Sequence, residues 1–128
     1  MTAALIEYAN RRLLVLNAEG PILSRTQDLL DLIQEAFSQK ASVLVVPVPR
    51  MDPAFFQLRS GLAGEFVQKV VNYQLKLVVV GDISAHVAAS DALRDFVREA
   101  NRGQTIFFVS QLEDLSVTPA FSAASRKD

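Results

Sequence analysis

The stretch Asp52–Tyr73, DPAFFQLRSGLAGEFVQKVVNY, lies between two short apolar runs, Ser42–Val46 (SVLVV) and Leu75–Val80 (LKLVVV). Continuous runs of β-branched and aliphatic residues are typical of strands buried on both faces of a parallel sheet. Asp52 and Pro53 suit the start of a helix, as N-cap and first helical residue. We therefore predict a strand, a helical connection and a second strand, the repeating unit of an α/β fold.

The central stretch divides into residues expected to anchor the helix and residues expected to face outward. The anchors are Phe55, Phe56, Leu58, Leu62, Phe66 and Val70. The outward set is Arg59, Ser60, Glu65, Gln68, Lys69, Asn72 and Tyr73, a mixture of donors, acceptors and an aromatic ring. Gly61 and Gly64 are expected to let the helix pack closely, because glycine has no side chain. Their spacing matches neither phosphate-binding glycine motif, although amides near Ser60 and Gly61 could form an anion site at a helix N-terminus.

Strands and helices alternate along the rest of the chain. The predicted elements are a hairpin of Ala4–Tyr8 and Leu13–Leu16, a helix at Thr26–Phe37, a helix after Ser90, a strand at Thr105–Val109 and a helical turn at Gln111–Leu115. The order β-β-α-β-α-β-α-β predicts a single-domain α/β sandwich with a mostly parallel sheet and an N-terminal hairpin. Residues 1–121 are expected to form the domain and residues 122–128 a disordered tail.

Three local details are also expected. Ser24 or Thr26 should cap the first long helix, and Phe37 should widen its apolar stripe. Asn101, Arg102 and Gly103 should end the last helix with a left-handed glycine.

Composition excludes several classes of function. The chain has 128 residues, a formal net charge of -1 and no cysteine, which excludes disulfides and thiolate zinc sites. No basic stripe is present, so we expect no nucleic-acid partner. No apolar run approaches the ~20 residues that span a bilayer, and the N-terminus does not read as a secretory signal. We expect a cytoplasmic protein with no membrane partner.

Catalytic chemistry has few candidates. A zinc site or a serine-type triad would have to use His86, the only histidine, which we interpret as an exposed loop residue. Glu65 with Asp82 or Glu99 could form an acid–base pair. Alternatively, Glu65 and Lys69 form an ordinary ion pair on the helix surface. We predict no catalytic residue, no metal and no cofactor.

The run FFQLRSGLAGEFVQKVVNYQLKLVVVGDIS, followed by SDALRDFVREANRG and TIFFV, resembles an uncharacterised bacterial family. That family is number four-one-eight-zero in the domain-of-unknown-function series, and the resemblance extends from Leu14 to Val109. The departures are Gln57 for an aspartate, Ser60 for a threonine and Val71 for an aromatic residue. The family has no assigned activity, so the resemblance implies membership without residue roles.

The hairpin followed by α-β-α-β-α-β is also similar to the STAS-like fold of anti-sigma-factor antagonists and related regulators. In that fold a phosphorylatable Ser or Thr begins the helix after the third strand, and Ser60 in RSGLAGEF resembles the SSGLG-type sequence there. The loop from Val46 to Ser60 is longer than usual, and the paired acidic and serine residues are missing. This resemblance implies a regulatory module, with a phosphorylation switch at Ser60 as a further possibility.

These observations favour a non-catalytic, STAS-like regulatory or protein-interaction module, whose partner is another protein or a second copy of the chain. The predicted contact surface is the outward set of the central stretch, together with Asp82. The alternative is a small enzyme or ligand-binding protein with a pocket near Phe56, Glu65 and Asp82, at the carboxyl edge of the sheet.

Overall fold

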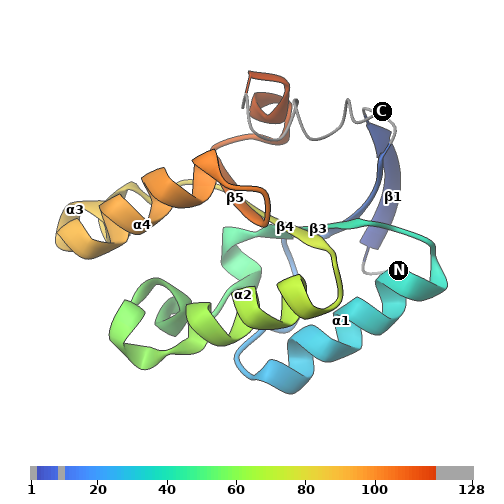
Figure 1. Ribbon diagram of the computed structural model, residues 1–128, viewed down its shortest axis with the longest axis horizontal. Coiled ribbons are helices and arrows are strands. Elements are labelled where there is room, and N and C mark those ends of the chain that lie inside the picture. The colour runs from blue at the N-terminus through green and yellow to red at the C-terminus, as the bar shows by residue number, and fades with distance from the viewer. Residues whose placement is uncertain (1–2, 9–10, 118–128) are drawn as a thin grey trace.

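The computed structural model describes residues 3–8 and 11–117, which form the mixed α/β domain shown in Figure 1. The strands are β1 (Ala3–Tyr8), β2 (Arg11–Leu16), β3 (Val43–Pro47), β4 (Lys76–Val80) and β5 (Ile106–Val109). The α-helices are α1 (Thr26–Ser38), α2 (Leu62–Asn72), α3 (Ser84–Ala89) and α4 (Asp91–Arg102). Short 3-10 helices lie at Val48–Arg50, Pro53–Phe56, Leu58–Ser60 and Leu112–Val117. The predicted fold class is confirmed, and the tail predicted at 122–128 lies outside the described residues.

The strands follow one another across the sheet in the order β1-β2-β3-β4-β5. The predicted hairpin is confirmed, because β1 and β2 pair antiparallel, although Arg11 and Arg12 belong to β2 rather than to the turn. The remaining pairs are parallel. Right-handed crossovers that always step in one direction place their helices on one face of a sheet. Figure 1 shows α1 and α2 on one side of the sheet and Leu112–Val117 on the other.

Side chains of the central strands alternate between two buried clusters. Leu44, Leu77 and Phe108 point toward the helices and belong to the main core. Their neighbours in the sequence point to the opposite face, where Val43, Val78 and Phe107 pack with Leu115. Burial on both faces explains why these strands are continuously apolar, and full burial of each such side chain contributes about 1.5–3 kcal/mol.

Phe55 is the centre of the helix-side core and is fully buried. Its ring lies 5.2 Å from that of Phe56, 5.7 Å from Phe66 and 6.3 Å from Phe108, measured between centroids. Asp52 caps the turn that carries it, because its carboxylate accepts a 2.8 Å hydrogen bond from the Ala54 amide. The predicted anchors are therefore buried, apart from half-buried Leu58.

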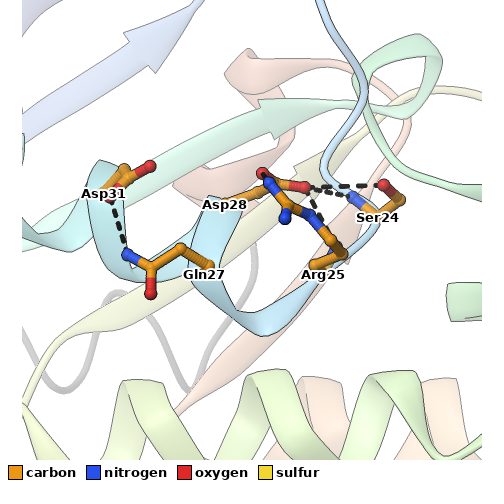
Figure 2. A network of polar contacts seen from close by, with 5 residues as sticks. All are labelled: Ser24, Arg25, Gln27, Asp28 and Asp31. Carbon is orange, nitrogen blue, oxygen red and sulfur yellow. Dashed lines mark hydrogen bonds and ion pairs between the residues drawn. The ribbon is translucent and has the colours of Figure 1, made fainter.

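The cap of α1 differs from the prediction. Neither Ser24 nor Thr26 caps it; the Asp28 carboxylate instead reaches back to accept hydrogen bonds of 3.0 Å from the amides of Ser24 and Arg25 (Figure 2). The Arg25 side chain also donates a 3.0 Å hydrogen bond to this carboxylate. The bond from the Ser24 amide, followed by the bond from the Arg25 side chain, lowers the pKa of Asp28. A carboxylate in the first turn also interacts favourably with the helix dipole. Because Asp28 fills the capping role, the Thr26 hydroxyl is available for another contact.

The glycines differ from the prediction as well. A Cβ atom at Gly61 or Gly64 would have no other heavy atom within 4 Å, so neither residue is needed for close packing. Gly61 instead allows the backbone to turn before α2, because its φ of 83° lies in the left-handed region that glycine favours. Gly103, predicted to be left-handed, has a φ of -90°. The predicted Ser90 cap of α4 is correct, since its hydroxyl accepts a 3.1 Å bond from the Leu93 amide.

The segment between β4 and α4, predicted to be a loop, contains the two-turn helix α3. Asp82 lies two residues before the helix, and its carboxylate accepts a 2.9 Å hydrogen bond from the amide of Ser84, the first helical residue. His86 consequently lies on a helix and is half-buried rather than in an exposed loop. In the described part of the chain, no helix is long and apolar enough to cross a membrane.

Candidate functional site

The surface where α1 and α2 lie side by side carries most of the residues predicted to make contacts (Figure 1). Glu65, Lys69 and Tyr73 recur every four residues, so they follow the edge of α2 that faces α1. The Thr26 hydroxyl donates a 2.8 Å hydrogen bond to the Glu65 carboxylate near the start of both helices. At the opposite end, the rings of Phe37 and Tyr73 meet with centroids 5.9 Å apart and planes tilted by 60°.

We call this surface the helix seam. It consists of Thr26, Gln27, Leu30, Gln34 and Phe37 of α1 with Glu65, Gln68, Lys69, Asn72 and Tyr73 of the α2 side. Two hollows follow it. One, of about 550 Å³, is lined by Thr26 and the start of α2, including Glu65 and Lys69. The other, of about 330 Å³, is lined by α1 residues and ends at Phe37 and Tyr73.

The aromatic end of the seam is open to solvent. The exposed fraction is 49% for Phe37 and 43% for Tyr73. Phe37, predicted to widen the apolar stripe of α1, lies at the exposed margin of that stripe, beyond buried Ile33 and Ala36. Nothing in the sequence near Phe37 indicates Tyr73 as its neighbour; only the parallel arrangement of the two helices brings these rings together.

The polar side of the seam is organised by local contacts. Gln68 donates a 3.1 Å hydrogen bond to Asn72, one turn later on the same exposed face. In the described residues no ion pair joins Glu65 to Lys69, so the predicted pair is not formed. Glu65 bonds to Thr26 instead, and Lys69 lines the same hollow.

Ser60 lies just before α2, where its hydroxyl makes two hydrogen bonds. It donates to the Ala54 carbonyl at 2.6 Å and accepts from the Leu62 amide at 3.2 Å. The side chain thus joins the preceding turn to the first residue of the helix. This contact gives Ser60 a structural role at the start of α2.

A separate hollow of about 670 Å³ lies between the central stretch and α3. Its walls include Phe56, Arg59, His86 and Ser90. The rings of Phe56 and His86 are stacked, with centroids 4.4 Å apart and an interplanar angle of 15°. Arg59 therefore belongs to this hollow and not to the helix seam.

The structure does not bring the three residues of the alternative pocket together. Phe56 lines the hollow beside α3, whereas Glu65 lines a hollow of the helix seam. Asp82 lines neither, and its hydrogen bonds with Ser84 lower its pKa and hold it as an ionised cap of α3. Among residues 3–8 and 11–117, no group of three or more His, Asp or Glu side chains could hold a metal ion.

Comparison with known proteins adds one finding. A model of the family described as Domain of unknown function (DUF4180) matches residues 8–118. No curated protein and no solved structure matches the chain.

Proposed function

The chain belongs to the DUF4180 family, and from that premise we propose that it is a bacterial, cytoplasmic protein-interaction module of STAS-like architecture that acts without catalysis. Membership of this family indicates neither a binding partner nor a catalysed reaction. The proposal therefore rests on the helix seam, and within it on the pair formed by Phe37 and Tyr73.

Two half-exposed aromatic rings in contact form the kind of surface that dominates protein binding. Large aromatic side chains are over-represented among the residues that contribute most to affinity. They are effective when polar groups around them exclude water from the contact. Gln68, Asn72 and Lys69 supply that polar surround on α2. Binding to a folded protein surface thus accounts for both the aromatic pair and its rim.

The absence of catalysis is inferred from how the reactive side chains are used. The Ser60 hydroxyl is bonded to Ala54 and Leu62. The Asp82 carboxylate caps α3, and the His86 ring is stacked on Phe56. Each side chain has a structural partner, and a nucleophile would instead need a base within hydrogen-bond reach.

Site-specific photo-crosslinking in the native host tests the proposal. A benzophenone amino acid is placed at Tyr73, at Phe37, or at the control position Arg98, which is exposed on α4. The proposal predicts one discrete product from Tyr73 and from Phe37 that Arg98 does not give. The mass of that product distinguishes a second copy from another protein. Equal products from all three positions, or none from the seam, would reject the helix seam as a contact surface.

The hollow beside α3 favours a second candidate function, the binding of a small ligand. The Phe56–His86 stack offers a flat aromatic wall, and Arg59 offers a positive charge nearby. A fragment screen observed by NMR would test it, with His86→Ala and Gln27→Ala as matched variants. Ligand-induced shifts that disappear only with His86→Ala would support a binding site, and the absence of any shift at this hollow would exclude one.

A further inference from the structure

A groove of about 620 Å³ lies between the outer part of the sheet and α1, away from the helix seam. Its floor is apolar and is formed by Leu5 of β1, Leu14 and Leu16 of β2, and Leu32 of α1. Opposite residues of an antiparallel pair point to the same side. Leu5 pairs with Leu14, which belongs to the helix-side core, so Leu5 faces the groove.

The α1 wall of the groove is acidic. Asp28, Asp31 and Glu35 line it at intervals of three and four residues, and Figure 2 shows the first two projecting from the start of α1. Asp31 and Glu35 accept hydrogen bonds from the neutral amides of Gln27 and Gln39, at 2.9 and 3.1 Å. Within residues 3–8 and 11–117, neither carboxylate forms an ion pair.

Among the described residues that line the groove, the one cationic side chain is already engaged in hydrogen bonds. Arg50 is buried, with hydrogen bonds to the carbonyls of Pro21, Asn17 and Glu19. Asp28 is paired with the Arg25 guanidinium group at 3.0 Å, so Asp31 and Glu35 are the carboxylates of the described lining that have no cationic partner, and the three carboxylates with Arg25 and Arg50 sum to a net charge of about -1. The groove therefore favours a positively charged occupant.

The groove opens toward an edge strand. In the described part of the chain, β1 pairs with β2 alone. Leu5 is 43% exposed on the groove side and Ile6 is 38% exposed on the opposite side. The strand carries no lysine or proline, the residues that commonly protect an edge. An added strand would cover both side chains and satisfy the outer backbone groups of β1.

We propose that β1 and α1 form a binding site for an extended basic segment of another protein, which adds to β1 as a sixth strand. The side chains of a strand alternate between its faces. Lysine or arginine side chains on the groove side lay their apolar stems over Leu5 and carry their charges to Asp31 and Glu35. β-Branched residues on the other side pack beside Ile6. The favoured sequence alternates basic and β-branched residues.

A second copy of this chain is a poorer occupant than a basic segment. Self-pairing of β1 would place Leu5 against Leu5, but it would bring Ala3–Tyr8, whose only charged side chain is Glu7, to an acidic groove. Like charges across a contact oppose association. Strand addition of a basic segment satisfies the same backbone groups and also pairs with the carboxylates.

The probe is a fluorescein-labelled peptide of sequence VKVRVKT, and its binding is followed by fluorescence polarisation. Asp31→Asn with Glu35→Gln should weaken binding by roughly 2- to 30-fold, the range expected for two partly exposed ion pairs. The matched control, Asp91→Asn with Glu99→Gln, removes two carboxylates of α4, and binding should be unchanged. Circular dichroism confirms that both variants are folded. Equal loss in both would overturn the proposal, because it would indicate attraction to net charge alone.

Two further peptides test for strand addition. They carry N-methyl groups at odd or at even positions, so that only one of them blocks the amides that face β1. One isomer should bind like the parent and the other should lose binding. Binding by both isomers, or no binding by the parent peptide, would reject the site. A concentration-dependent dimer, seen by light scattering and abolished by Leu5→Lys, would instead assign the groove to a second copy.

Discussion

The Thr26 hydroxyl donates a hydrogen bond of 2.8 Å to the Glu65 carboxylate, and so joins the first turn of α1 to the first turns of α2. Both residues lie at the surface, 39 positions apart in the sequence. Their bond links the two helices near one end of the helix seam. The ring contact between Phe37 and Tyr73 does the same at the other end.

A double-mutant cycle of Thr26→Val and Glu65→Ala should measure this coupling. We expect an interaction energy of about 0.5–1.5 kcal/mol, the usual net value of one hydrogen bond. The free energy of unfolding of the four proteins is obtained from urea titrations. If the two single changes add without coupling, the bond contributes nothing in solution.

Gly64→Ala should stabilise the protein and Gly81→Ala should destabilise it. Gly64 is helical and a Cβ there meets open space, so alanine should add about 0.5–1 kcal/mol. Gly81 has a φ of 142°, and its Cβ would lie 2.8 Å from Cγ2 of Val48, so alanine there should cost more than about 1 kcal/mol. Thermal unfolding of the pair measures both, and a loss of stability with Gly64→Ala would mean that α2 does pack against that position.

The sequence predicts the buried strands well, but it does not predict the packing around single residues. The runs at β3 and β4 were predictable, because burial on both faces requires an unbroken series of apolar residues. The open space at Gly64, where close packing was predicted, could not be foreseen, because the space around a glycine depends on neighbours distant in the sequence. The exposure of Phe37 was missed for a related reason: periodicity identifies the centre of an apolar stripe on a helix and leaves the margin of the stripe undefined.

The candidate site was predicted only in part. Four outward residues of α2 and its C-cap Tyr73 do lie on one surface, since helical spacing alone places them there. Their partners on α1 could not be predicted, because no local pattern records which helix will lie alongside. Helix α3 was missed because its six residues are too few to show periodicity. As a result, the stacking of His86 on Phe56 was missed with it.

Arg50→Met should destabilise the domain by about 2–4 kcal/mol. The guanidinium group donates to the carbonyls of Pro21, Asn17 and Glu19 at 2.6, 2.9 and 3.3 Å. Methionine has a similar length but leaves these acceptors without a donor. Arg98→Met, an exposed control on α4, should change stability by less than about 0.5 kcal/mol. Equal effects in urea titrations would show that the loop at 17–21 does not depend on Arg50.

Asp28 should make stability depend on acid pH. Its pKa is lowered in the folded state, first by the Ser24 amide and then by the Arg25 side chain. Its stabilisation is therefore complete above the unfolded pKa of about 3.9 and is lost as the pH falls through the lower folded value. The difference in unfolding free energy between the parent and Asp28→Asn should be largest at pH 6 and smaller at pH 2. A difference that grows on acidification would contradict this sign.

Asn101 lies in the last turn of α4 and makes two hydrogen bonds to β5. Its amide donates to the Phe108 carbonyl at 3.2 Å, and its oxygen accepts from the Phe108 amide at 2.8 Å. The side chain thus pairs with the edge strand β5 as a neighbouring strand would. Asn101→Ala should cost about 2 kcal/mol, because both backbone groups lose their partner.

Asn101→Asp separates the two bonds. At neutral pH the carboxylate still accepts from the Phe108 amide, but it opposes the Phe108 carbonyl, so this variant should also be destabilised. Contact with that carbonyl disfavours the charged form and should raise the pKa of the new carboxyl group. On acidification the group regains a proton to donate, so Asn101→Asp alone should recover stability between neutral pH and acid pH. Urea titrations across that range, with Asn101→Ala as the control that lacks a titrating group, decide whether the donor bond to β5 contributes.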